Sequence, residues 1–217
     1  EPVNRLLKGV EHITLLAPLD YLPLVHLMKR SALILTDSGG IQEEAPAFGI
    51  PTLVLREVTE RPEGVAAGTL KLVGTDTNRI VGAALRALMD ATDEAFLDRH
   101  PVFGLFRGDL RRAAGHGDFI SRAYVDGERR VAGEALAALA KIPRAALSPT
   151  DRIAWDTFAW TMDEWRERHS PPAANIWPLL KIDQQNGWHL FFPELSSGDG
   201  VVPYRTVADY DAGLARI

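Results

Sequence analysis

The chain has 217 residues, of which 46% are hydrophobic and 24% are charged, and this ordinary balance predicts a globular protein with one large or two small domains. The formal net charge of −5 gives no reason to expect nucleic acid or an anionic membrane as a partner, and no apolar stretch approaches the ~20 residues of a membrane-spanning helix. The lack of cysteine excludes disulfides and thiolate metal sites and favours a cytoplasmic location.

Short apolar runs alternate with amphipathic segments up to Asp90. Residues 1–12 are typical of the end of a helix. Helices are also expected after Asp20, from Gly39 onward and over Arg79–Asp90. This alternation predicts an α/β fold with a parallel sheet of about four strands and right-handed crossovers. The apolar runs that are too short for helices, and that we interpret as these strands, are Ile13–Leu16, Ala32–Thr36, Thr52–Leu55 and Thr69–Val73.

The second of these strands runs into a glycine-rich turn. The turn lies in the stretch Thr36-Asp37-Ser38-Gly39-Gly40-Ile41-Gln42-Glu43-Glu44-Ala45-Pro46. A strand, two glycines and a helix start form a cradle for an anion, because free backbone N–H groups face the turn and Ser38 adds a hydroxyl. The missing Cβ atoms of Gly39 and Gly40 would let a phosphate approach the main chain. A simpler interpretation is a helix capped by Asp or Ser after a tight turn.

A charged loop, Val58-Thr59-Glu60-Arg61-Pro62-Glu63, follows the next strand. Ligands of open α/β sheets sit at the carboxyl ends of strands, and here two successive strand ends carry polar loops. Together, Thr36–Glu63 closely resembles the nucleotide-binding half of the non-hydrolysing UDP-N-acetylglucosamine 2-epimerases. The likeness runs from about Ile13 to Asp90. It implies part of a Rossmann-like lobe of the glycosyltransferase-B type over residues 1–91.

The resemblance implies UDP or a UDP-sugar as the ligand and no cofactor. It assigns Ser38, Gly39 and Gly40 to the diphosphate, Glu44 to the ribose hydroxyls, and Arg61 to the nucleotide. The chemistry of each residue agrees, because backbone N–H groups and a guanidinium suit phosphate oxygens and a carboxylate suits a vicinal diol. Two further carboxylates, Glu43 and Glu60, are expected to be only a helix-start charge and a solvated loop residue.

The family inverts carbon 2 of the sugar by eliminating UDP and adding it back to the other face. In the family, the carboxylates and the histidine that move the proton come from the N-terminal lobe and the start of the C-terminal lobe, and this sequence has no counterpart of either. No catalytic residue is therefore assigned, and the fragment is expected to be inactive alone. The resemblance also implies a possible homodimer.

Helical periodicity dominates the second predicted domain, residues 92–217. Helices are expected at Asp93–His100, Phe119–Ala140 and from Ser148 to Arg168, where Ser170-Pro171-Pro172 ends the last one. On that last helix, a stripe of Ile153, Trp160 and Trp165 is interpreted as core packing. The remainder is expected to be mostly loop until a final helix begins at Val207.

This second region resembles the opening of the bacterial domain-of-unknown-function 885 family. The likeness rests on three segments: His100–Asp109, Leu147–Asp156 and Pro203–Tyr210. It implies a long, largely helical protein with a zinc-peptidase-like His-Glu motif much later in its chain. No His-Glu-x-x-His pair occurs in this sequence, so no metal site is assigned. No histidine has the neighbours of a catalytic triad.

Three hypotheses remain open. The chain is the back half of an epimerase nucleotide lobe joined near residues 89–94 to a helical segment, by a genuine fusion or by an artefact of gene prediction or assembly. Alternatively, it is a non-catalytic UDP-binding or scaffold module, or a truncated peptidase-like protein. Stabilisation by UDP without turnover would favour the second hypothesis, and chelator-sensitive hydrolysis the third.

Overall fold

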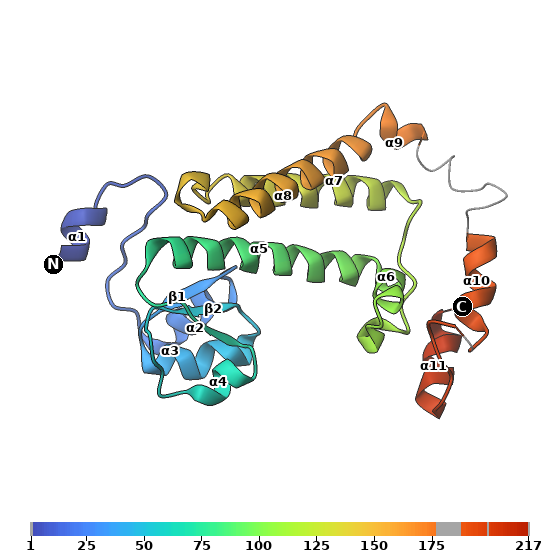
Figure 1. Ribbon diagram of the computed structural model, residues 1–217, viewed down its shortest axis with the longest axis horizontal. Coiled ribbons are helices and arrows are strands. Elements are labelled where there is room, and N and C mark those ends of the chain that lie inside the picture. The colour runs from blue at the N-terminus through green and yellow to red at the C-terminus, as the bar shows by residue number, and fades with distance from the viewer. Residues whose placement is uncertain (1, 177–187, 199, 217) are drawn as a thin grey trace. The chain divides into compact units, whose positions relative to one another are not determined.

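The computed structural model describes residues 2–176, 188–198 and 200–216 (Figure 1). The chain divides into two compact units, Glu1–Asp76 and Thr77–Ile217. The first is α/β and the second is helical, as expected. The predicted domain boundary between residues 91 and 92 lies inside helix α5 (Thr77–Arg99), which runs without a break. The hypothesis that two segments of different origin meet at this boundary stays a prediction.

The first unit contains a three-stranded parallel sheet. Its strands are β1 (Ile34–Thr36), β2 (Thr52–Val54) and β3 (Leu70–Leu72), in the order β1-β2-β3. Leu53 lies opposite Leu35 on one side and Lys71 on the other. The central strand β2 is buried along its whole length, as expected for an apolar run with a strand on each side.

The first predicted strand, Ile13–Leu16, is not a strand, and the expectation of about four strands was wrong. Its first residue instead donates its N–H to Val10 in a turn, at 3.2 Å. Its apolar side chains are largely exposed, with Leu16 57% accessible. An apolar run becomes a strand only where a neighbouring strand accepts its backbone hydrogen bonds, and within the described residues this run has no such neighbour.

Short helices connect the strands of the first unit. The expected helix after Asp20 is α2 (Tyr21–Lys29), although the Asp20 side chain makes no cap hydrogen bond. A small core of Met28, Ile34 and Ala45 packs α2 and the helices after β1 against the sheet. The other helices of this unit are α1 (Pro2–Leu7), α3 (Gly39–Glu44), the 3₁₀ helix η1 (Ala45–Phe48) and α4 (Pro62–Ala66).

Two of the predicted helices of the second unit are confirmed, and each begins at a capping serine. Helix α7 (Arg122–Leu139) begins after Ser121, and α8 (Pro149–Arg168) begins after Ser148. Both serine side chains accept a backbone N–H of the first turn. The remaining helices are α6 (Pro101–Phe106), η2 (Leu110–Arg112), η3 (Arg144–Ala146), α9 (Ala173–Ile176), α10 (Trp188–Ser196) and α11 (Val207–Arg216).

Two expectations about these helices were wrong. The predicted helices Arg79–Asp90 and Asp93–His100 form the single helix α5, which ends at Arg99, because no Pro or Gly interrupts the chain between them. The region after Pro172 contains α9 and α10 as well as loop. The part of the predicted loop at 177–187 lies outside the described residues.

The core of the second unit lies between α5, α7 and α8, and α7 and α8 run alongside each other (Figure 1). Its buried members are Leu85, Ala135, Leu139, Leu147 and Phe158. The predicted core stripe on α8 was wrong for Ile153 and Trp160, which are 68% and 69% exposed. The face that α8 turns inward instead carries Trp155, Phe158 and Met162. Within the described ranges, no helix is both long and apolar enough to cross a bilayer.

Candidate functional site

The predicted site lies at the carboxyl ends of β1 and β2. Since these strands are parallel and adjacent, the segments that leave them start at the same edge of the sheet. The structure joins those segments directly. Thr59 Oγ1, in the loop after β2, donates to Gln42 Oε1 of α3 at 2.5 Å. The Arg61 guanidinium forms an ion pair with the Glu43 carboxylate of the same helix.

Ser38 is the N-cap residue of α3. The backbone therefore agrees with the simpler interpretation, a helix that begins at a capping Ser after a tight turn. Its N–H donates to Thr36 Oγ1 at 3.0 Å, and its carbonyl accepts the Gln42 N–H at 3.2 Å. The Ser38 side chain, however, makes no cap hydrogen bond. The side chain is exposed, which leaves its hydroxyl available to a ligand.

The space that side chains would occupy at Gly39 and Gly40 is open. A Cβ added to Gly39 would meet no atom within 4 Å, and one added to Gly40 would meet only Ser38 Oγ, at 3.9 Å. The N–H groups of Gly39, Gly40 and Ile41 have no acceptor inside the helix, because the chain four residues earlier is not helical. An anion can therefore approach three backbone donors here. With six residues, α3 has a small dipole, so these donors matter more than the helix as a whole.

The other two predicted site residues lie at the ends of the same arrangement. Glu44 is the last residue of α3 and is half-buried. Arg61 is the N-cap residue of α4, and its Nη1 donates to the Glu60 carbonyl at 3.2 Å. The ion pair with Glu43 brings the Arg61 side chain to α3, next to Glu44 in sequence. The structure thus links all five predicted residues through one short helix and its partner loop.

Sequence reasoning missed the link itself, which is made by Gln42, Glu43 and Thr59. Gln42 is only 3% exposed, and a buried polar side chain on a helix requires a hydrogen-bond partner. The inward position of Gln42 on α3 was the available signal. Glu43 is more than the helix-start charge that was expected, because it is the ion-pair partner of Arg61.

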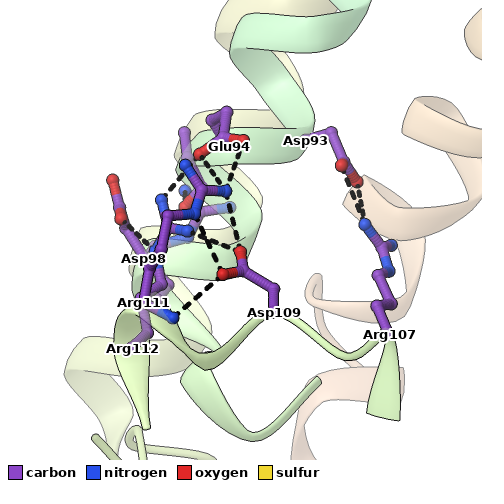
Figure 2. A network of polar contacts seen from close by, with 9 residues as sticks. Asp93, Glu94, Asp98, Arg107, Asp109, Arg111 and Arg112 are labelled. Atoms are coloured by element: carbon purple, nitrogen blue, oxygen red, sulfur yellow. Dashed lines mark hydrogen bonds and ion pairs between the residues drawn. The ribbon is translucent and has the colours of Figure 1, made fainter. Parts of the chain in front are cut away.

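A second polar cluster lies on the surface of the helical unit (Figure 2). Carboxylates of α5 face arginines from the segment after α6; for example, Arg112 Nε lies 2.6 Å from Asp98. Hydrogen bonds from Arg111 lower the pKa of Asp109 to about 2. Each arginine of the network is paired with a carboxylate within it. We therefore interpret the cluster as a set of ion pairs that holds the segment after α6 against α5, and not as a ligand site. Its labelled members are Asp93, Glu94, Asp98, Arg107, Asp109, Arg111 and Arg112.

Glu128 of α7 is a buried charge in the same unit, 1% exposed. It accepts Arg99 Nε at 2.5 Å and Trp165 Nε1 at 2.9 Å, and His100 Nε2 lies 3.4 Å away. Burial by itself would raise the pKa of Glu128, but contacts with His100, Arg99 and Trp165 outweigh it and lower that pKa to about 2. The carboxylate therefore joins three helical segments as an anion.

A cleft of about 510 Å³ lies between α5, α7 and α8. Its walls are mainly apolar and aromatic, and its two arginines are already paired, Arg99 with Glu128 and Arg107 with Asp93. In the part of the chain that the structure describes, no three His, Asp or Glu side chains converge to hold a metal ion. Among the described residues, we take the turn after β1 as the candidate anion site.

Comparison with known proteins agrees with the predicted resemblance over the first half of the chain. Residues 1–106 match the family model of UDP-N-acetylglucosamine 2-epimerase. The match covers the first unit and continues through α5 and α6, beyond the predicted boundary at 91/92. It therefore overlaps the start of the segment interpreted as domain-of-unknown-function 885, and that second resemblance stays a prediction.

Curated relatives carry the same name. The UDP-N-acetylglucosamine 2-epimerase of Yersinia pestis is 62% identical over 92 residues, which are 42% of this chain and 24% of the relative. Its counterpart in Salmonella typhimurium is 55% identical over 105 residues, 48% of this chain and 28% of the relative. A crystal structure of UDP-GlcNAc 2-epimerase from Neisseria meningitidis bound to UDP-GlcNAc is 59% identical over 36% of this chain and 22% of that chain, with a TM-score of 0.34. Residues 1–106 are thus homologous to these epimerases, and the chain spans about a quarter of the curated relatives' length.

Proposed function

We propose that the first unit binds the uridine diphosphate part of a UDP-sugar at the carboxyl ends of β1 and β2. The observation that carries this proposal is the open turn at Gly39-Gly40, where the first N–H groups of α3 have no helical acceptor and no atom crowds the position that a Gly39 side chain would take. The homology of residues 1–106 to UDP-N-acetylglucosamine 2-epimerases supports the choice of ligand.

Each residue has a distinct role in the proposed complex. The N–H groups of Gly39 and Gly40 and the Ser38 hydroxyl bind the diphosphate oxygens. The Glu44 carboxylate accepts hydrogen bonds from the two ribose hydroxyls. Arg61 adds a positive charge, since a guanidinium can contact a phosphate oxygen while another of its nitrogens remains on Glu43.

We further propose that residues 1–217 bind this ligand without turning it over. Epimerisation requires an acid/base pair at carbon 2 of the sugar in addition to a diphosphate cradle. The cradle stabilises the leaving UDP, and the sequence has no counterpart of the family's proton-transfer residues. The homodimer, the cytoplasmic location and the join near residues 89–94 are part of the same proposal and stay predictions.

The proposal is tested by thermal unfolding in the presence of UDP. At a UDP concentration ~100 times its Kd, the first unit should gain about 2–3 kcal/mol of stability. Ser38→Trp should abolish this gain, because an indole would fill the space in front of the turn. As a control, Ala32→Trp places the same bulk at the opposite, exposed end of β1 and should keep the gain. An equal gain in Ser38→Trp would place any nucleotide elsewhere.

This proposal corresponds to the second hypothesis, a non-catalytic UDP-binding or scaffold module. The first hypothesis, an epimerase fragment joined to a helical segment, predicts weak or no UDP binding and no turnover. Conversion of UDP-GlcNAc to UDP-ManNAc by residues 1–217 alone would contradict the proposed inactivity and both hypotheses together. The peptidase-like hypothesis predicts hydrolysis that a chelator abolishes.

A further inference from the structure

The loop after β2 is attached to α3 by a short chain of hydrogen bonds. Gln42, which is almost completely buried, accepts the Thr59 hydroxyl hydrogen on its Oε1 at 2.5 Å. The same Thr59 oxygen accepts the backbone N–H of Arg61 at 3.0 Å. One hydroxyl therefore connects the helix that begins at the glycine turn with the main chain of Arg61.

The side chain of Arg61 is held as well. Its Nη2 pairs with Glu43 and its Nη1 donates to the Glu60 carbonyl. Arg61 thus has one contact to α3 at its main chain, through Thr59, and another at its guanidinium. A long cationic side chain that is fixed before binding loses less conformational freedom when a ligand arrives. The exposed ion pair contributes less to this fixation than the half-buried hydroxyl contact does, because water and salt screen it.

We propose that Thr59, held by the buried Gln42, is a positioning residue that sets Arg61 beside the anion-binding turn. The inference rests on the proposed function, since it concerns the affinity of that same site for a nucleoside diphosphate. Thr59 acts through Arg61 and does not touch the ligand. Its removal should therefore weaken binding only while Arg61 is present.

The test is calorimetric titration of the full chain with UDP. Thr59→Val keeps the shape of the side chain and removes the hydroxyl, and it should weaken UDP binding about three- to tenfold, as expected for the loss of one or two hydrogen bonds. Thr59→Ser keeps the hydroxyl and should restore the affinity. In an Arg61→Ala background, Thr59→Val should have no further effect, because the group that it positions is gone.

Thr69→Val is the matched control. Thr69 precedes β3 at the other edge of the sheet, and its hydroxyl donates to the Gly64 carbonyl at 3.0 Å, so the variant loses a comparable hydrogen bond away from the site. Equal weakening by Thr69→Val, or equal weakening by Thr59→Val with and without Arg61, would overturn the inference. So would normal UDP binding by Thr59→Val. If the unsubstituted chain binds no UDP, the proposed function itself fails, and the inference falls with it.

Discussion

Glu128 is buried in the helical unit, and three side chains hold its carboxylate. Arg99 and Trp165 donate hydrogen bonds to it, and the buried His100 ring lies beside it. An isolated buried carboxylate would take up a proton, whereas these partners keep it charged. Removing one partner of a buried ion pair leaves the charge of the other partner buried without compensation. The resulting loss of folding stability is large even when the intact pair contributes little net stability.

Glu128→Gln should therefore lower the free energy of unfolding by about 3 kcal/mol at neutral pH. The measurement is urea unfolding followed by tryptophan fluorescence. Glu134→Gln is the matched control, because Glu134 lies on the same helix but is exposed in an i,i+4 pair with Arg130, so its effect should be near zero. Equal stability of the two variants would contradict this account of Glu128.

The same group predicts how stability depends on pH. The pKa of Glu128 is lowered from 4.5 to about 2 in the folded chain. A lowered pKa means that the contribution is complete above pH ~4.5, where the unfolded chain is also ionised, and is lost as the pH falls towards 2. Glu128→Gln should show a smaller loss of stability between pH 5 and pH 3 than the unsubstituted chain does.

At the scale of single elements, the cap of α8 is a local feature that the sequence predicts well. Ser148 Oγ accepts the Asp151 N–H at 3.1 Å. Ser148→Ala leaves that first-turn donor without its acceptor and should cost about 1 kcal/mol in urea unfolding. Ser170→Ala, at the other end of the helix, removes an exposed hydroxyl that donates to the Arg166 carbonyl, and its effect should stay within ~0.5 kcal/mol. A Ser148→Ala effect no larger than the control would argue against the cap.

Elements were predictable where their cause is local. The caps of α7 and α8 depend on residues within one turn, and the three confirmed strands are apolar runs between turn residues. Prediction failed for Ile13–Leu16 and for Trp160, because strand formation and burial depend on what lies opposite them. An apolar side chain on a helix identifies a face for packing only if the neighbouring helix lies on that side.

The candidate site shows the same division. Ser38, Gly39, Gly40 and Glu44 are contiguous enough in sequence to be recognised as one turn and helix start. The contact between Gln42 and Thr59 joins residues 17 positions apart, and nothing in either segment alone specifies it. The sequence therefore predicts the groups proposed to bind the ligand, whereas the structure adds the groups that hold Arg61 in place.

At the scale of the whole molecule, each unit has its own hydrophobic core. One core is built around Met28, Ile34 and Ala45, and the other around Leu85, Leu139 and Phe158. The first unit has a small core and exposes many apolar side chains, including Leu6, Leu16 and Leu22. Burial alone gives a small unit of this kind little stability margin, so the proposed ligand would add a large share of its stability.

Ligand binding should therefore stabilise the two units unequally. All five tryptophans lie at residue 155 or later, so tryptophan fluorescence reports only on the second unit. At ~100 times its Kd, UDP should slow hydrogen exchange of the β1–β3 amides, and the slowing should correspond to about 2–3 kcal/mol of added stability. The unfolding transition of the second unit, followed by tryptophan fluorescence, should not move. Arg61→Ala, which weakens the site, should reduce the exchange effect at the same UDP concentration. A fluorescence transition that moves with UDP as far as the exchange does would show that the two cores unfold as one.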